Sequence, residues 1–170
     1  MDMLDRTIGL LGELIAVPTV STNSNLALIA WASDQLGALG AQVRISTDPT
    51  GTKANMFATI GPEGDGGIVL SGHSDVVPAE GQDWASDPFE MAERDGHIYG
   101  RGACDMKGFI AAVLCMAPRF AQRNLSRPLH IALTYDEETG CFGARALAEE
   151  LRKDGIRPAA AIIGEPTSMR

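Results

Sequence analysis

The residues best suited to catalysis or metal binding are a histidine and an aspartate two positions after it. His73 follows the apolar run at residues 68–70, which is typical of a buried strand, and Asp75 comes next at a spacing of two. If the chain stays extended, both side chains leave the same face, so the carboxylate can orient the imidazole and raise its basicity. A histidine in an ordinary strand-to-loop turn explains His73 alone equally well.

Three acidic clusters further along the chain strengthen the metal interpretation. They contain Asp105, the adjacent pair Glu137 and Glu138, and Glu165. One imidazole with several carboxylates suits divalent Zn, Co or Mn better than Ca or a lone Mg. In the glutamate pair one residue can ligate while the other stays free as a base, which is a common arrangement for amide hydrolysis. The spacing leaves open which glutamate does which.

Each cluster also has a purely structural explanation. Asp105 can be a helix cap, Glu137 and Glu138 can form a solvated first turn, and Glu165 can belong to a surface turn. What favours a site is that every cluster stands at a predicted strand end or helix start.

The elements that must position these side chains alternate between strand and helix. We expect helices at 3–16, from a cap at Asn23 or Ser24 to about 39, at 106–122 and at 144–153, and strands at 42–46, 55–60, 68–73, 96–99, 129–135 and 159–163. From residue 68 onward this order predicts an α/β fold, a mostly parallel sheet with helices on both faces. Carboxyl ends of parallel strands share one edge, so the histidine and the glutamates should converge there. Asp105 joins them if the glycine-rich turn at 100–102 brings its helix start to the same rim.

The composition is that of one globular domain with an acidic surface. The 170 residues are 45% hydrophobic and 21% charged, and 22 acidic against 14 basic residues give a formal net charge of −8. Without a cluster of lysine or arginine, nucleic acid and anionic membranes are poor partners. No apolar run approaches the ~18 residues that a membrane-spanning helix needs, and no signal-like N-terminus is present, so we expect a cytoplasmic protein.

The three cysteines do not suggest a thiolate metal site or a disulfide framework. Cys104, Cys115 and Cys141 are odd in number and lack paired ligand spacing. Cys115 lies in an apolar helical stretch and is expected in the core. Cys104 and Cys141 adjoin the acidic clusters, so they are candidates to line the site without ligating.

Four motifs carry a resemblance to a known family. They are GHSDVVP at 72–78, GRGACDMKG at 100–108, DEETG at 136–140 and GEPT at 164–167. In this order they resemble the motifs of the aminoacylase / acetylornithine deacetylase family, over nearly the whole chain. The resemblance implies a two-metal, aminopeptidase-like catalytic domain that holds two divalent ions, Zn²⁺ or Co²⁺.

Within this family, the segments DPF at 87–89, DMKGF at 105–109 and IIGEPT at 162–167 are most similar to the acetylornithine deacetylase branch. That branch frees ornithine and acetate from N-acetylornithine in arginine biosynthesis. The substrate that the resemblance implies is therefore a small N-acyl amino acid, and the enzyme class is a metal-dependent deacetylase.

The resemblance also implies a role for each candidate residue. One ion would be held by His73 and Glu165, a second by Glu138, with Asp105 bridging both ions, Glu137 acting as general base and Asp75 orienting His73. These roles agree with the chemistry that the residue types suggest, and they add an expectation about which glutamate ligates.

The chain is shorter than the family pattern requires. Family members continue past the GEPT segment into a lid domain, then complete the catalytic domain and supply a late metal-binding histidine. We therefore expect residues 1–170 to be the N-terminal portion of the catalytic domain, with the lid/dimerisation domain and the C-terminal catalytic segment absent. His97 and His130 lie away from the motifs, so the second ion would lack one ligand.

Two classes of function follow from these observations. The first is a metal-dependent deacetylase, inactive as this chain alone and completed by further sequence. Within that class, a relative of succinyl-diaminopimelate desuccinylase or of small-peptide carboxypeptidases is the alternative. The second class is a non-catalytic metal-binding or association module. Apolar surface left uncovered in either case predicts homo-oligomers.

Overall fold

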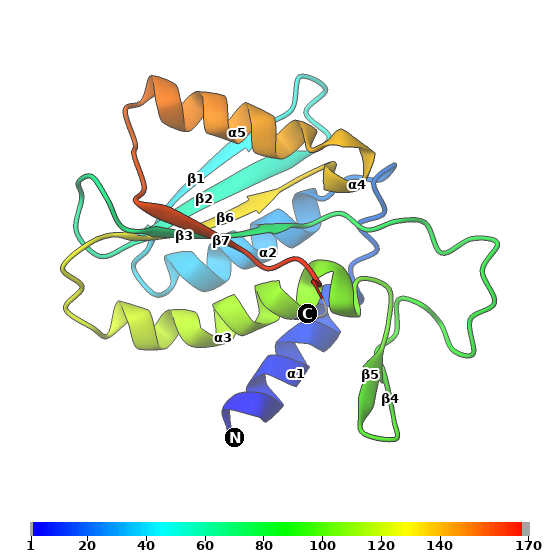
Figure 1. Ribbon diagram of the computed structural model, residues 1–170. Helices are drawn as coiled ribbons and strands as arrows, with labels where there is room; N and C mark the ends of the chain where they lie inside the picture. The colour runs from blue at the N-terminus through cyan, green and yellow to red at the C-terminus, as the bar shows by residue number, and fades with distance from the viewer. Residues whose placement is uncertain (1, 168–170) are drawn as a thin grey trace.

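The computed structural model describes residues 2–167 and shows a five-stranded sheet between helices on both faces (Figure 1). The helices are α1 (Met3–Ile15), α2 (Leu26–Gly37), α3 (Gly108–Ala121), the single turn α4 (Glu137–Gly140) and α5 (Phe142–Lys153). The strands of the sheet are β1 (Gln42–Thr47), β2 (Ala54–Ile60), β3 (Ile68–His73), β6 (Leu129–Thr134) and β7 (Ala160–Ile163). A small separate hairpin pairs β4 (Ala92–Arg94) with β5 (His97–Tyr99).

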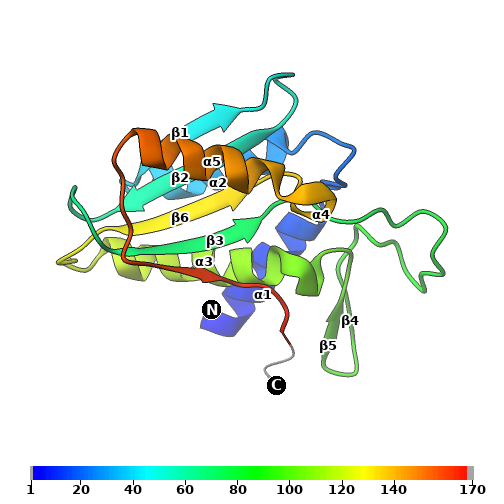
Figure 2. The ribbon, with the colours of Figure 1, turned by 45° about the horizontal axis from the view of Figure 1, so that its top comes forward.

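The strand order in the sheet is β1-β2-β6-β3-β7 (Figure 2). Strand β3 is parallel to β6 and β7, whereas β2 is antiparallel to both β1 and β6. Strand β2 alone therefore runs against the other strands. The predicted α/β fold is confirmed, with mixed pairing, because the short turn between β1 and β2 leaves no room for the crossover that parallel neighbours need.

The main core lies between the sheet and the helices α1, α2 and α3. Leu14 and Ile15 of α1, Leu28 of α2 and Ile110 of α3 are almost completely buried there, together with Leu133 of β6. Helix α1 begins where the Asp2 carboxylate accepts a hydrogen bond of 2.8 Å from the Asp5 amide. The predicted helix at 3–16 is confirmed.

Helix α5 covers the opposite face of the sheet. Its Leu147 packs with Phe57, Val69 and Ala132, which alternate with residues that face the other layer. This second, smaller core keeps β2, β6 and β3 sandwiched between helices (Figures 1 and 2). Among the described residues, no helix is long and apolar enough to cross a bilayer.

The structure corrects several element boundaries. Helix α2 follows Asn25, whose side chain makes no cap hydrogen bond and binds Ala54 and Ser74 instead; of the two predicted caps, Ser24 accepts a bond of 3.2 Å from the amide of Leu26, the first helical residue. Asp105 was expected to open the long helix, but it lies in a kinked turn over Ala103–Lys107, and α3 begins at Gly108. The turn α4 was not predicted, since four residues carry no helical periodicity.

Candidate metal centre

His73 is placed by the end of a buried strand. It is the last residue of β3 and is 2% exposed, so its imidazole is held on a rigid element. Asp75 follows it, 3% exposed, where the chain forms a parallel bridge between Val20 and Val76. The carboxyl ends of β3, β6 and β7 lie at one edge of the sheet, as the sequence predicted (Figure 2).

Two carboxylates from distant parts of the chain meet the outer nitrogen of this imidazole. His73 Nε2 lies 2.9 Å from Asp105 Oδ1 and 3.7 Å from Glu165 Oε1. One ligand atom from each of the three residues fits within a mutual separation of 4.8 Å, which is compatible with a single ion. The predicted convergence of His73, Asp105 and Glu165 is therefore seen in the geometry.

A second group shares the same histidine. Glu137 Oε2 lies 3.8 Å from His73 Nε2, and Glu137 and Glu138 each offer an oxygen within 4.8 Å of the imidazole and of each other. An extended chain would point these two carboxylates to opposite sides, but both glutamates stand in α4, where consecutive residues are not on opposite faces.

Asp75 contacts His73 in a different way from the one that the spacing suggested. His73 Nδ1 lies 2.9 Å from the backbone oxygen of Asp75 and 3.6 Å from its carboxylate Oδ1. A carbonyl oxygen only accepts, so Nδ1 carries a proton, and Nε2, which faces the carboxylates, is the nitrogen that a metal ion would take. The carboxylate of Asp75 instead accepts bonds from Ser21 Oγ and from the amides of Glu137 and Glu138.

The electrostatics of the cluster favour a bound cation. Burial raises the pKa of Glu138 and of Glu165, and the charge of Asp105 raises both further, although His73 opposes the shift. Burial lowers the pKa of His73, but the Asp75 carbonyl, the Asp105 carboxylate and nearby charges outweigh it, so this pKa lies above its usual value. Crowded carboxylates around one imidazole are the donor set that a divalent Zn or Co ion prefers.

Glycines allow the turn that brings Asp105 to His73. Gly102 has φ of 79°, and a Cβ atom there would lie 2.6 Å from Val76 Cγ1. A Cβ at Gly108 would lie 2.6 Å from the oxygen of Ala103. The spacing of GRGACDMKG therefore reflects a tight backbone path that larger residues would block.

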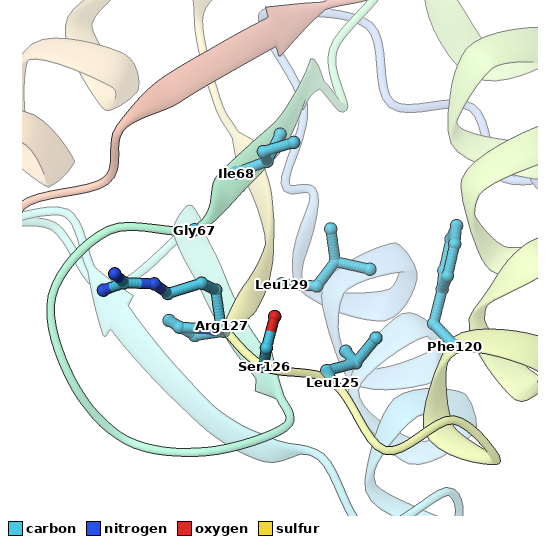
Figure 3. A pocket seen from close by; sticks show the side chains of 8 residues that line it. Gly67, Ile68, Phe120, Leu125, Ser126, Arg127 and Leu129 are labelled. Atoms are coloured by element: carbon cyan, nitrogen blue, oxygen red, sulfur yellow. The ribbon is translucent and has the colours of Figure 1, made fainter.

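A hollow of about 200 Å³ adjoins the cluster. Asp105 and Glu138 line it together with Arg101 and residues 102–104. A different, mainly apolar cavity of about 210 Å³ is lined by Ile68, Phe120 and Leu129 and lies at the amino ends of β3 and β6 (Figure 3). Only the first is next to the acidic residues.

The remaining histidines and cysteines are where we expected them. His97 is exposed on β5, and His130 is buried beside Thr59, with Nδ1 2.9 Å from its hydroxyl oxygen. Neither joins the metal-compatible groups found among residues 2–167. The cysteines are free thiols, with Cys115 buried, and Cys141 Sγ lies 3.6 Å from Glu137 Oε1.

Three residues around the site were missed from the sequence. Ser21 and Lys53 lie far away in the chain, and no motif pointed to them. Lys107, within the DMKG segment, is completely buried and donates bonds of 2.8 and 2.7 Å to the oxygens of Leu14 and Val17. Its place beside Asp105 was the only available signal.

An α/β domain with one imidazole and several carboxylates at the carboxyl edge of its sheet has the architecture of a metal-dependent hydrolase domain. The chain belongs to peptidase family M20/M25/M40, whose family model matches residues 69–170. The resemblance found from the motifs is thereby confirmed.

Curated relatives cover most of this chain. It is 43% identical to the acetylornithine deacetylase of Shigella sonnei (strain Ss046) over 92% of its length, and 40% identical to that of Pasteurella multocida (strain Pm70) over 100%. It spans only 42% and 45% of those proteins.

Solved structures share the fold. Human carnosine dipeptidase 1 matches with a TM-score of 0.79 at 27% identity, over 94% of this chain and 38% of that one. The M20 family metallo-carboxypeptidase Sso-CP2 from Sulfolobus solfataricus matches with a TM-score of 0.81 at 20% identity, over 96% and 37%.

Proposed function

We propose that this chain is the N-terminal part of the catalytic domain of a metal-dependent amide hydrolase, with N-acetyl-L-ornithine as substrate. The observation that carries the proposal is one buried imidazole, that of His73, on which two pairs of carboxylates converge. The pairs are Asp105 with Glu165 and Glu137 with Glu138. The identity to two acetylornithine deacetylases, 43% and 40%, supports the choice of substrate.

The residues fit two divalent ions of the Zn²⁺ or Co²⁺ type. His73 and Glu165 would hold the first ion, Glu138 would hold the second, and Asp105 would serve both. We expect the first site to fill before the second, because the described residues offer Glu138 no histidine of its own. When bound, the ions polarise the scissile carbonyl group and activate a water molecule.

The protein groups around the ions handle protons and orientation. Glu137 takes the proton from the attacking water and passes it to the leaving amine, as a general base and acid. Its side chain is half-buried, with 35% of it accessible, which leaves it room to reach the substrate. His73 is kept in one tautomer by the Asp75 carbonyl, and the hollow beside Asp105 has room for an acyl group.

Further sequence completes this site in the proposal. The curated relatives are more than twice as long as their match to this chain, which spans 42% and 45% of them. A further ligand for the second ion and a lid over the substrate would come from that additional length. The 170-residue chain by itself is then inactive towards substrate while it still binds metal.

A peptidase is the second candidate function. The similarity to human carnosine dipeptidase 1, at 27% identity, favours it. A dipeptide and an N-acyl amino acid both present an amide next to a free carboxylate, so the residues described here suit either one.

Metal titration of this chain tests whether His73 belongs to a metal site, on which the proposed function depends. His73→Ala should abolish tight binding of Co²⁺, while His97→Ala, the matched control at an exposed histidine, should leave it unchanged. Binding that depends on His97 and not on His73 would overturn the site.

Substrate choice is tested in the full-length protein. N-acetyl-L-ornithine should be hydrolysed with a higher kcat/KM than N-succinyl-diaminopimelate or a dipeptide. Preference for a dipeptide would establish the second candidate, and a metal-loaded but inactive full-length protein would point to a non-catalytic module.

A further inference from the structure

The two glutamates of the site stand on a turn that cannot hold its own shape. Helix α4 has four residues, and the residues on either side of it, Asp136 and Cys141, have positive φ values of 55° and 56°. A single helical turn is unstable alone, because it fixes several dihedral angles for one hydrogen bond. Contacts from elsewhere must therefore position Glu137 and Glu138.

The carboxylate of Asp75 supplies the first of these contacts. Its Oδ1 accepts a bond of 3.0 Å from the Glu137 amide, and its Oδ2 accepts one of 3.3 Å from the Glu138 amide. Ser21 Oγ donates to the same Oδ2 at 2.7 Å. Asp75 and Ser21 are 3% and 7% exposed, so water does not compete freely for these bonds.

Lys53 supplies the second contact, from the other side of the turn. Its ammonium group donates to the backbone oxygen of Ser21 and to the Asp136 carboxylate. The Lys53 and Asp136 side chains are 15% and 17% exposed. Such a partly buried, charge-assisted pair fixes the left-handed residue that precedes Glu137.

These hydrogen bonds, with the chain link between Asp136 and Glu137, form a closed ring of contacts. We name it the Ser21 ring, and its members are Ser21, Asp75, Glu137, Asp136 and Lys53. We propose that Ser21 and Lys53 are positioning residues that, through this ring, hold Glu137 and Glu138 in the geometry that the metal chemistry needs. This inference rests on the proposed function for its catalytic consequence, while the ring itself is defined by contacts within the chain.

The Ser21 hydroxyl can be removed without removing the backbone that carries it. The amide of Ser21 donates to Val76 O at 3.0 Å, and the amide of Val76 donates to Thr19 O at 3.0 Å. These bonds keep the segment beside β3 in any Ser21 variant. An effect of Ser21→Ala is therefore expected to be local, on the Asp75 carboxylate and on the two amides that share it.

The first measurement is amide hydrogen exchange by NMR on the 170-residue chain. Ser21→Ala should raise exchange at the amides of Glu137 and Glu138 by about tenfold, the effect of one lost hydrogen bond. Lys53→Met, which removes the bonds to Ser21 O and to Asp136, should raise it at least as much. Ser21→Thr, which keeps the hydroxyl, should restore protection. The matched control is Thr19→Val, which removes a buried hydroxyl bound to Ser74 O in the same segment without touching Asp75.

The second measurement is Co²⁺ titration of the same variants. Ser21→Ala should lower the Co²⁺ affinity of the site at the glutamate pair by roughly tenfold, the lower end of what a residue that orients a metal ligand contributes. The affinity of the site at Glu165 should stay unchanged. If Ser21→Ala, Lys53→Met and Thr19→Val show equal amide exchange and equal Co²⁺ affinity, the Ser21 ring does not position Glu137 and Glu138. If the unmodified chain binds no Co²⁺, the proposed function fails, and the exchange rates still decide whether the ring holds the turn.

Discussion

At the scale of single residues, His73 is the hub because its two nitrogens have different partners. Nδ1 donates to the Asp75 carbonyl at 2.9 Å, and Nε2 faces the carboxylates of Asp105, Glu137 and Glu165. With Nδ1 bound to the carbonyl oxygen, Nε2 is the nitrogen that would ligate an ion placed between it and the carboxylates.

The roles of the two glutamates can be separated by isosteric substitution. In the full-length protein, Glu137→Gln should keep both metal ions and lose ~10²–10⁴-fold in kcat, because it removes a general base. Glu138→Gln should instead lose the second ion. Metal content and kcat measured on both variants decide the question, and the reverse pattern would show that the two roles are exchanged.

Asp75→Asn is a sharper test than a truncation. The carboxylate accepts three bonds, from Ser21 and from two amides, and an asparagine would turn an NH₂ group towards one of these donors. We expect metal affinity or activity to fall by roughly 10–100-fold. If Asp75→Asn is unaltered in metal binding, Asp75 is only a loop residue.

At the scale of elements, the turn that carries Asp105 is tied to the end of α1. Lys107 donates from this turn to Leu14 O in the last turn of α1 and to Val17 O just beyond the helix, and each of these oxygens also accepts a backbone amide. One buried ammonium group thus joins α1, the turn over Ala103–Lys107 and, through Asp105, the metal centre.

Lys107 should leave a signature in the pH dependence of stability. Burial lowers its pKa from 10.5 to about 8. Between these values the unfolded chain keeps a proton that the folded chain has lost, so this group makes the free energy of unfolding rise with pH. Below about 8 both states are protonated, and the burial cost is constant.

Denaturant unfolding at several pH values checks this expectation. The unfolding free energy of the unmodified chain minus that of Lys107→Met should increase with pH between about 8 and 10.5. Below pH 8 this difference should not change with pH. Lys153→Met, at an exposed position in the last turn of α5, should show no such slope. A flat difference for Lys107→Met would mean that the buried amine keeps its ordinary pKa.

At the scale of the whole molecule, one edge of the sheet is apolar and open. Within residues 2–167, strand β7 pairs only with β3, and its Ile162 and Ile163 are 49% and 63% exposed. Ile68 of the neighbouring strand is 41% exposed, beside the cavity of Figure 3. Open strand edges with large apolar side chains promote pairing with other chains.

We therefore expect the 170-residue chain to associate through β7. Light scattering should give the mass of a dimer or a larger species, and Ile163→Lys should shift it towards the monomer. The control is Ile45→Lys on β1, the strand at the opposite edge of the sheet, where Ile45 is 47% exposed. This change should leave the mass unchanged. A monodisperse monomer for the unmodified chain would contradict the prediction.

Much of this architecture could be predicted from the sequence because it depends on local pattern. The apolar runs of β3, β6 and β7 and the amphipathic stripe of α1 follow from side chains at close spacing. The parallel crossovers then bring the strand ends to one edge, which is why His73, Glu137, Glu138 and Glu165 could be assigned to one site.

The tertiary structure alone decided what surrounds those residues. Ser21 and Asp75 are 54 positions apart, Asp75 and Glu137 are 62 apart, and Lys53 and Asp136 are 83 apart, so no local pattern could pair them. The turn α4 has no periodicity to reveal it, and its conformation comes from hydrogen bonds across the fold. Side chains supply chemistry through their types, but their partners are set by packing between segments that meet only when the sheet is assembled.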